Sequence, residues 1–526
     1  MDSRVVKLNQ VPAPPNAASP RDKVRTLEEV GRIAAQLRQA GRTVVQAHGT
    51  FDLLHLGHVR HLEAARALGD LLIVTVTADR FVNKGPGRPV FSAEMRAEML
   101  ATNEYVDWVA INNAPDAVSA IDCVRPSIYV KGQDYRDPQG DVTGKISLER
   151  AAVEAHGGQI RFTDEVTFSS SELINRHINV FEPHIRQHLD TLRRDGGLDD
   201  MLALIERVRD YRVLLIGDAI IDEYQYVVPM GKTPKENMIA TRYQDRELFA
   251  GGVFAAANHV ASFCKQVDII TCLGDSRSFE DFIRQSLRPN VRMRAFQRAS
   301  APTTLKRRFV DPTYMRKLFE VCFINDEPLT RDVQQEVDAT ILSTAGDYDI
   351  VVVADFGHGL LAPSSIEALN ETARFLAVNT QSNSANLGYN LITKYPSANY
   401  ICIDAPEARL AVSDRISDIG EIARRLVERH VACSKIIVTQ GKHGCVTYER
   451  GGVAHTIPAF AKNVVDTVGA GDAFLAITSP LVAAGGLMHH IGFIGNVAGA
   501  LKVEIVGHRF SIDKPSLIKG ITGLLK

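Results

Sequence analysis

Two histidines separated by two residues stand near the N-terminal end of the chain, in the segment 49–58, which reads Gly-Thr-Phe-Asp-Leu-Leu-His-Leu-Gly-His. A β-rich run precedes this segment and a helical pattern follows it, so we expect His55 and His58 at a strand-to-helix junction. Gly57 lets a triphosphate approach closely, and a helix N-terminus attracts anions. Hydrogen-bond donors placed there would stabilise nucleotidyl transfer. Helix capping and zinc binding are the alternatives, although zinc usually takes three or four protein ligands.

A second candidate group is Asp472, in the segment 466–474, which reads Asp-Thr-Val-Gly-Ala-Gly-Asp-Ala-Phe. Glycines at a helix start leave backbone N–H groups exposed, and these groups can hold a phosphoryl group. The carboxylate one residue further on can accept the proton of an attacking hydroxyl. The segment therefore indicates phosphoryl transfer to a hydroxyl; the alternative is a helix whose first turn is merely acidic.

Strands and helices alternate around the histidine pair. Helices are predicted over residues 27–40, 58–68 and 93–102, and strands over residues 43–47, 71–77 and 107–111. Parallel strands need crossover connections, so this alternation predicts an α/β domain with a doubly wound, Rossmann-like sheet. Ligands of such sheets bind at the carboxyl ends of the strands, where the histidines stand.

A second α/β unit follows a charged stretch that is expected to form a joining helix. Its predicted strands are residues 213–216, 267–271, 350–354, 400–403 and 435–439. Residues 225–248 and 304–323 interrupt the alternation and are expected to form a small β lid. The expected organisation is a disordered tail over 1–22, a first domain over 23–180, a helical linker over 181–203 and a second domain over 204–526.

The composition narrows the classes of function. The chain has 526 residues, and its formal net charge of −2 provides no field that would attract nucleic acid or an anionic membrane. Its seven cysteines form no CxxC pair, which argues against a zinc ribbon, a redox motif or a disulfide framework. The apolar stretch 474–500 is interrupted by proline, glycine and histidine, so it predicts a buried helix pair rather than a membrane span. We expect a cytoplasmic protein that binds small phosphorylated molecules.

The first domain resembles the HxGH nucleotidyltransferase superfamily. It is most similar to the adenylyltransferases that activate heptose 1-phosphates, through residues 83–90 (Asn-Lys-Gly-Pro-Gly-Arg-Pro-Val), 130–135 (Val-Lys-Gly-Gln-Asp-Tyr) and 169–174 (Ser-Ser-Ser-Glu-Leu-Ile). Residues 164–167 differ from the Arg-Thr-Glu-Gly segment of glycerol-phosphate cytidylyltransferases, which disfavours that branch. The resemblance implies that His55, His58 and Lys84 are catalytic and that the nucleotide is bound by Thr50, Phe51, Arg96, Lys131, Asp134, Ser170 and Ser171.

The second domain resembles the ribokinase-like carbohydrate kinases, through the segment around Asp472 and other segments in the family's order. The resemblance makes Asp472 the catalytic base and Gly469, Ala470 and Gly471 the cradle for the transferred phosphoryl group. It implies further nucleotide contacts by Thr439, Gly441 and Gly444, magnesium binding by Asp404 and Glu407, and sugar contacts by Asp222, Gly251, Gly252, Asn258, Lys306 and Asp355.

Three departures from the kinase pattern bear on the substrate. Asp404 stands where the family has asparagine, although a carboxylate can still hold Mg²⁺ through water. Residues 378–383 form a polar loop where heptose kinases tend to have Asp-Pro-Lys, and Phe254 is a bulky residue after the glycine-rich turn. The familiar bifunctional heptose enzymes also carry the kinase domain first.

Together the two resemblances imply a bifunctional enzyme that makes a nucleotide-activated sugar. ATP would phosphorylate a sugar or sugar phosphate at the anomeric position, and a nucleoside triphosphate would then react with the sugar 1-phosphate, with Mg²⁺ as cofactor and a homodimer as the expected assembly. An ADP-heptose-type product is the first expectation. The alternatives are a CTP-dependent transferase paired with a kinase for another sugar or polyol, and a transferase whose kinase half has become a sugar-sensing module.

Overall fold

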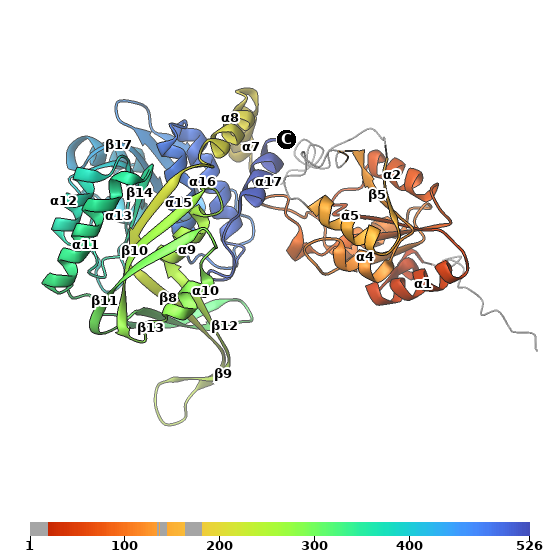
Figure 1. Ribbon diagram of the computed structural model, residues 1–526, viewed down its shortest axis with the longest axis horizontal. Helices are drawn as coiled ribbons and strands as arrows, with labels where there is room; N and C mark the ends of the chain where they lie inside the picture. The colour runs from red at the N-terminus through yellow and green to blue at the C-terminus, as the bar shows by residue number, and fades with distance from the viewer. Residues whose placement is uncertain (1–18, 134–135, 137–144, 164–180) are drawn as a thin grey trace, which may run out of the picture. The chain divides into compact units, whose positions relative to one another are not determined.

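The computed structural model describes residues 19–133, 136, 145–163 and 181–526. The chain divides into two compact units, Met1–Glu182 together with Lys526, and Pro183–Leu525. Each unit is built on a largely parallel sheet with helices, as the alternating pattern predicts (Figure 1). Asp134, Ser170 and Ser171, which the sequence assigns to nucleotide binding, lie outside the described residues.

The described strands of the first unit form a six-stranded sheet in which all neighbours are parallel. In order across the sheet they are β1 (Val24–Arg25), β4 (Trp108–Asn112), β3 (Leu71–Thr77), β2 (Val44–Gly49), β5 (Ile128–Gly132) and β6 (Gln159–Thr163). The chain runs outward from β2 through β3 to β4 and then crosses back to β5. Ligands of doubly wound sheets bind at such a switch point, and the histidine segment directly follows β2.

Helices cover both faces of this sheet. They are α1 (Leu27–Gln39), α2 (Leu56–Arg66), α3 (Ala93–Ala101), α4 (Val118–Val124) and α5 (Lys145–Ala155). Side chains of α2 and α3 share one buried cluster with the central strands, and those of α1 and α4 share another. Helix α2 begins at Leu56, two residues before the predicted start, so His55 is its N-cap and His58 lies in its first turn.

The main sheet of the second unit has nine described strands, parallel from β11 to β17, with two antiparallel strands added at one edge. In order they are β11 (Val291–Pro302), β10 (Gln266–Ser276), β7 (Arg212–Gly217), β14 (Ile350–Asp355), β15 (Leu376–Thr380), β16 (Ser397–Asp404), β17 (Ala432–Thr439), β18 (Cys445–Glu449) and β19 (His455–Ile457). All five strands predicted from apolar runs are present.

Helices also pack on this sheet (Figure 1). Side chains of α11 (Arg331–Thr344), α12 (Pro363–Thr372), α13 (Ala405–Ala411) and α14 (Ile419–Arg425) share one large buried cluster with the strands. The remaining helices are α7 (Pro183–Arg194), α8 (Gly197–Arg207), α9 (Val253–Val260), α10 (Glu280–Ser286), α15 (Ala470–Ala483), α16 (Met488–Lys502) and α17 (Lys514–Leu525). Helices α15 and α16 are the buried pair predicted for the apolar stretch 474–500.

The predicted lid is a second, four-stranded sheet in the order β13 (Arg316–Phe323), β12 (Thr304–Asp311), β8 (Ala219–Lys232) and β9 (Ile239–Gly252). Strands β8 and β9 form a long antiparallel hairpin, and β12 runs parallel to β8. The start of β8 and the end of β9 are buried, whereas the hairpin tip is exposed. The buried portion carries Asp222 and Gly251.

Helices α7 and α8 occupy most of the range in which a linker is expected, and both belong to the second unit. They bury apolar side chains, among them Leu192 and Met201. The guanidinium of Arg193 also donates to the carbonyl oxygen of Leu524, at 2.7 Å. The chain therefore passes from the first unit to the second before α7.

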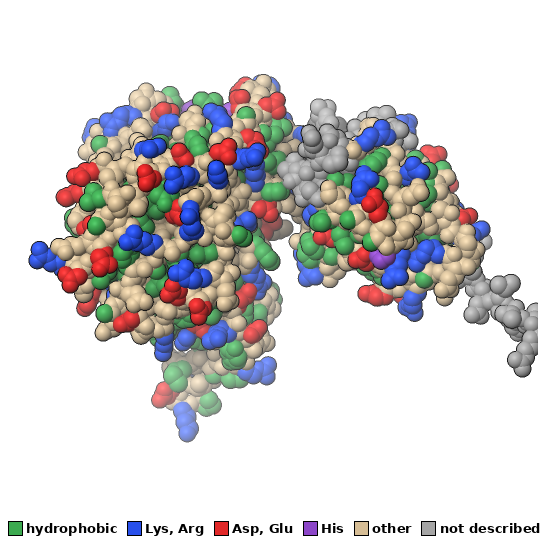
Figure 2. All heavy atoms as spheres, in the orientation of Figure 1, with side chains coloured by type: hydrophobic (Ala, Val, Ile, Leu, Met, Phe, Trp, Pro, Cys, Tyr) green, Lys and Arg blue, Asp and Glu red, His purple; other side chains and the backbone are tan. Residues whose placement is uncertain are grey.

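The surface carries both signs of charge. On the face shown in Figure 2, Lys and Arg side chains alternate with Asp and Glu side chains, which agrees with the near-neutral net charge. In the part of the chain that the structure describes, no helix combines the length and apolar character needed to cross a membrane.

Candidate active sites

His55 and His58 lie together at the first turn of α2. Their rings stack with centroids 3.9 Å apart and planes inclined by 24°. The ring of Phe51 meets that of His58 edge-on at a centroid distance of 5.3 Å. The side chain of His55 makes no capping hydrogen bond to the helix, so the pair is not explained as a helix cap.

Burial and nearby positive charge disfavour protonation of both imidazoles. Burial, together with the neighbouring His55 and Lys84, lowers the pKa of His58 to about 3. Burial and Lys84 also lower the pKa of His55. Lys84 therefore lies within electrostatic reach of both histidines. A bound anion would counter this field, because a negative neighbour favours the charged imidazole.

Asp52, which the sequence analysis did not single out, joins the two loops of this site. Its fully buried carboxylate accepts hydrogen bonds from the guanidinium of Arg88 at 3.1 Å and from the backbone N–H of Val90 at 2.6 Å. These bonds tie the loop that carries Lys84 to the loop that carries the histidines. The sequence offered no signal for Asp52 beyond its place next to Phe51.

Arg96 and Phe51 support the site instead of facing a ligand. Arg96 is fully buried, and its guanidinium donates to the carbonyl oxygens of Thr50 and Thr77 and to the carboxylate of Asp79. Phe51 has a left-handed backbone (φ 49°), and its ring belongs to the core. Arg96 thus fixes the backbone at Thr50, because its donors are engaged by protein oxygens.

Lys131 adds positive charge near the site although its ammonium is ion-paired. Its Nζ lies 2.8 Å from Oε2 of Glu149, and both side chains are buried. Burial and the charge of Lys131 lower the pKa of His61 to about 4. The hydroxyl of Tyr129 also donates to Glu149, at 3.1 Å.

In the second unit, Asp472 lies in the first turn of α15, directly after the glycine-rich cradle. The helix N-cap is Gly469, with φ 76°, and a Cβ placed on Gly471 would meet no atom within 4 Å. The cradle therefore has open space beside Gly471. Burial raises the pKa of Asp472, while the nearby His508 and a hydrogen bond from Gln381 lower it. A raised pKa makes the carboxylate a better proton acceptor.

Gln381 links the expected site residues, and the sequence analysis missed it. Its Nε2 donates to Oδ1 of Asp472 at 2.8 Å, and its backbone N–H donates to the carbonyl oxygen of Asp355 at 2.8 Å. The N–H of the next residue, Ser382, donates to Glu407 at 2.9 Å. The available signal was the polar loop after β15, which the sequence analysis singled out only as a departure from the family.

Asp404 and Glu407 form a capping box at the start of α13. The backbone N–H of each residue donates to the other's carboxylate, at 2.8 and 2.9 Å. Burial and the charge of Asp404 raise the pKa of Glu407 to about 8. Such a pair suits a divalent cation, because the cation would offset the repulsion between two carboxylates. Among the described residues, no cluster of three or more His, Cys, Asp or Glu side chains could hold a metal ion.

Asp222, Gly251 and Gly469 come together around one side chain, His508. Asp222 is buried, accepts a hydrogen bond from Arg308 and lies 3.4 Å from Nε2 of His508. A Cβ on Gly251 would lie 2.2 Å from Oδ2 of Asp222, and a Cβ on Gly469 would lie 2.3 Å from Cε1 of His508. Both positions therefore require glycine.

Asp355 is fully engaged by protein donors. Its buried carboxylate receives hydrogen bonds from the hydroxyl of Tyr395 at 2.6 Å and from Asn390 at 3.2 Å, and it pairs with Lys394 at 2.5 Å. These bonds do not favour the direct sugar contact expected of Asp355, because protein donors already occupy its carboxylate. In the structure it orders the loop that carries Gln381.

The three other expected sugar contacts are Asn258, Gly252 and Lys306. Asn258 bonds through both ends of its amide to backbone groups of Ser286 and Arg288, at 2.9 and 3.0 Å. Phe254 is fully buried in α9, so the bulk noted in the sequence serves the core. Gly252, with φ 55°, is the N-cap of the same helix. Lys306 lies on the lid, with its Nζ 5.8 Å from the centre of the Phe356 ring.

The expected nucleotide turn follows β17. Thr439 ends the strand, and Gly441 and Gly444 have positive φ angles of 54° and 88°. A Cβ on Gly444 would lie 2.0 Å from the carbonyl oxygen of Ile457, so the turn requires glycine there.

The backbone before the cradle is fixed by buried charges. The ammonium of Lys502 is fully buried and donates to the carbonyl oxygens of Val468 and Gly507, at 2.8 and 2.7 Å. Asp466 accepts from the hydroxyl of Tyr224 at 2.6 Å and pairs with Lys317 at 2.5 Å. These contacts hold the two loops that flank Gly469 and His508.

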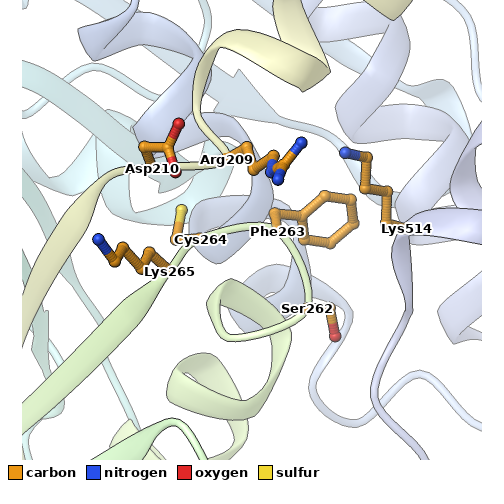
Figure 3. Close-up of a pocket in the computed structure, with 7 residues that line it drawn as sticks. All are labelled: Arg209, Asp210, Ser262, Phe263, Cys264, Lys265 and Lys514. Carbon is orange, nitrogen blue, oxygen red and sulfur yellow. The ribbon is translucent and has the colours of Figure 1, made fainter.

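A pocket of about 500 Å³ lies elsewhere in this unit (Figure 3). Its lining residues precede β7 and β10 or begin α17: they are Arg209, Asp210, Ser262, Phe263, Cys264, Lys265 and Lys514. The strand amino ends mark the sheet edge opposite the one that carries Asp355, Asp404 and Thr439. The pocket is therefore separate from the candidate kinase site.

Comparisons with known proteins match a different family to each unit. A family model described as pfkB family carbohydrate kinase matches residues 211–515, and one described as cytidylyltransferase-like matches residues 47–176. Relatives include the bifunctional protein HldE of Methylococcus capsulatus, 42% identical over 158 residues, and that of Syntrophotalea carbinolica, 36% identical over 163 residues. Each alignment covers 30% of this chain and 32% of the relative, so the chain spans about a third of the length of these relatives.

Solved structures with a similar arrangement include phosphofructokinase-2 from Escherichia coli in complex with potassium, at 13% identity and a TM-score of 0.49, covering 60% of this chain and 100% of that chain. Ribokinase from Thermotoga maritima matches at 17% identity and a TM-score of 0.46, covering 59% of this chain and 99% of that chain. The pfkB match takes in more than half of the 526 residues. The chain therefore belongs to the pfkB family of carbohydrate kinases, and a cytidylyltransferase-like domain precedes its kinase domain.

Proposed function

We propose that this chain is a bifunctional enzyme that makes a nucleotide-activated sugar, with an ADP-heptose-type product as the first candidate. The kinase unit phosphorylates a sugar or sugar phosphate at its anomeric hydroxyl, and the first unit joins the resulting 1-phosphate to a nucleotide. A phosphate that the substrate already carries stays on the sugar through both steps unless a separate phosphatase removes it. The carrying observation is that Gln381 holds Asp472 beside the Gly469–Gly471 cradle. The relatives named bifunctional protein HldE support a protein with two activities, although the match covers only part of their length.

In the kinase reaction, the sugar hydroxyl attacks the γ-phosphorus of ATP, the bond from that phosphorus to the bridging oxygen breaks, and ADP leaves. Asp472 takes the hydroxyl proton, for which burial suits it by raising its pKa. The backbone N–H groups of the cradle bind the transferring group. Mg²⁺, held by Asp404 and Glu407, would neutralise phosphate charge.

In the transferase reaction, an oxygen of the sugar 1-phosphate attacks the α-phosphorus of the nucleoside triphosphate, and pyrophosphate leaves. Neutral His55 and His58 each offer one N–H donor toward the phosphates, and Lys84 supplies positive charge. Arg96 and Asp52 hold the two loops in place. We also propose that the enzyme is cytoplasmic and that it acts as a homodimer.

Product analysis tests the proposal. The full chain is incubated with Mg²⁺, ATP or CTP, and a panel of sugar phosphates, and products are identified by mass spectrometry. In the ATP reactions we expect a sugar bisphosphate and an ADP-sugar that still carries the phosphate of the starting sugar phosphate. A CDP-sugar formed only with CTP would replace the adenylyltransferase assignment, and a folded protein that phosphorylates no sugar in the panel would contradict the kinase assignment.

A further inference from the structure

His508 is a buried histidine of the kinase unit that no motif assigned to the site. It follows α16 in a loop whose carbonyl at Gly507 is held by Lys502. Only 5% of its side chain is exposed. Its ring lies against Gly469, the N-cap of α15 and the first residue of the phosphoryl cradle. The His508 ring therefore lines the candidate kinase site beside the cradle.

The two ring nitrogens of His508 have different surroundings. Nε2 lies 3.4 Å from the carboxylate of Asp222, whereas Nδ1 is buried and has no hydrogen-bond partner among the described residues. A Cβ on Gly469 would lie 2.3 Å from Cε1, 2.9 Å from Nδ1 and 3.2 Å from Nε2, so the Cε1 edge of the ring faces the cradle with one nitrogen on each side. Because Nε2 is next to Asp222, Nδ1 is the nitrogen left for a ligand in the cradle. Buried polar atoms are almost always hydrogen-bonded, so an unpartnered one calls for an explanation.

The ring of His508 lies close to the groups that would surround a phosphoryl group in transfer. Asp222 lies on the Nε2 side and Asp472 is within electrostatic reach of the ring. A phosphoryl group in transfer carries negative charge on its equatorial oxygens, and donors aimed at it stabilise the transition state. A ring nitrogen that carries hydrogen can donate to such an oxygen, and Nδ1 is the one that the protein leaves without a partner among the described residues.

We propose that His508 is a catalytic residue of the kinase site, whose Nδ1 donates a hydrogen bond to an oxygen of the phosphoryl group during transfer. This inference rests on the proposed kinase function. His508 forms no covalent bond in the step: the sugar oxygen bonds to the γ-phosphorus, the bond to ADP breaks, and the hydroxyl proton goes to Asp472. Asp222 positions the ring through Nε2.

Two near-isosteric substitutions separate the roles of the two nitrogens. The amide of His508→Asn can place an N–H near the position of Nδ1, and that of His508→Gln can place one near Nε2. His508→Ala removes both. We expect His508→Asn to keep most of the kinase kcat, and His508→Gln and His508→Ala to lose about a hundredfold, the effect of removing one donor to a transition state.

Inhibition constants of the kinase reaction distinguish a catalytic role of His508 from a structural one. A structural defect would weaken the binding of a transition-state mimic and of ADP alike. ADP with aluminium fluoride mimics the phosphoryl group in transfer, whereas ADP alone does not. In His508→Gln and His508→Ala we expect weaker inhibition by ADP with aluminium fluoride, in proportion to the loss in kcat, and unchanged inhibition by ADP. His508→Asn should resemble the wild-type protein in both constants.

Two other results would overturn the inference. Equal weakening of inhibition by both ligands would make His508 a structural residue, and retention of activity by His508→Gln but not His508→Asn would make the Asp222 contact the important one. If His508→Ala does not fold, the Asn and Gln variants still decide between these results. A wild-type protein without kinase turnover would refute the proposed function, and this inference with it.

Discussion

At the residue scale, the kinase reaction depends on how one carboxylate is held. Asp472 is almost fully buried, yet it sits beside open space at Gly471 and receives a single side-chain hydrogen bond, from Gln381, among the bonds described. A buried carboxylate with few donors is a poorer anion and a better proton acceptor. The motif could identify Asp472, but Gln381 comes from a loop 91 residues earlier in the chain, and its contact required the fold.

Asp472→Asn should remove the proton acceptor while keeping the side-chain shape. We expect kinase kcat to fall by at least about a hundredfold, because a positioned base contributes 10²- to 10⁴-fold. The matched control is Asp418→Asn, the same chemical change at an exposed residue that caps α14, where asparagine is also a good N-cap. Steady-state kinetics should show kinase activity retained in the control. Equal losses in both variants would contradict the assignment.

The surroundings of the histidine pair predict how the protonation of His58 depends on pH. Because the pKa of His58 is lowered to about 3, its imidazole stays neutral in the free protein from pH 8 down to pH 5. A bound triphosphate adds negative charge and raises this pKa toward the ordinary value of about 6.5. NMR of the full chain labelled at histidine, with His58→Gln to assign the signal, should show titration in this range only with nucleotide present. Titration of His58 near pH 6.5 in the free protein would contradict the buried site.

At the element scale, glycines decide how closely strands, helices and side chains approach one another. Gly251, near the end of β9, lies against Asp222 on the neighbouring strand, and Gly469 begins α15 against His508. The sequence analysis assigned both glycines to ligand contacts. The structure adds that each makes room for a charged or polar side chain of the same unit.

Gly251→Ala should therefore disable the kinase without affecting the transferase. The added Cβ would lie 2.2 Å from Oδ2 of Asp222, so the carboxylate and its bond to Arg308 must shift. Gly499→Ala is the matched control, since a Cβ there meets nothing within 4 Å and the position is helical. Paired assays of both half-reactions should show a kinase loss only for Gly251→Ala. Normal kinase turnover in that variant would argue against a tightly packed Asp222.

Elements with strong patterns were predictable from sequence. Residues 71–77 form β3 with the bounds expected, because the run is buried throughout and made of apolar residues and threonines that favour strands. The start of α2 was misplaced by two residues, because His55 caps the helix through its backbone position and carries none of the usual capping side-chain signals. The roles of Arg96 and Asn258 could not be predicted from the neighbouring residues in the sequence, because each side chain bonds to backbone groups far along the chain.

At the scale of the whole molecule, two units with separate cores carry separate chemistry. Helices α7 and α8 pack with the second unit, as the hydrogen bond from Arg193 to the carbonyl of Leu524 illustrates. The boundary for dissecting the protein is therefore between residues 182 and 183, not at residue 204, where the sequence analysis begins the second domain.

Fragments test this boundary. A fragment of residues 183–526 should unfold at a higher temperature than one of residues 200–526, because the shorter fragment loses the buried Leu189 and Leu192 of α7 and exposes their partners. Burying one leucine side chain contributes about 1.5–3 kcal/mol. Thermal unfolding followed by circular dichroism compares the two. Equal midpoints would show that α7 adds nothing to the kinase unit.

The central claim is that one chain performs two successive reactions at independent sites, and a mixing experiment tests it most directly. Asp472→Asn lacks the kinase base and His58→Ala lacks a transferase donor, so neither protein alone should convert ATP and the accepted sugar phosphate into nucleotide-sugar at more than a trace rate. A mixture of the two should restore the product, because His58→Ala supplies the sugar 1-phosphate that Asp472→Asn consumes. Mass spectrometry should detect the nucleotide-sugar in the mixture and the accumulated bisphosphate with His58→Ala alone. A mixture that makes no nucleotide-sugar, although each folded variant retains its other half-reaction, would contradict the account.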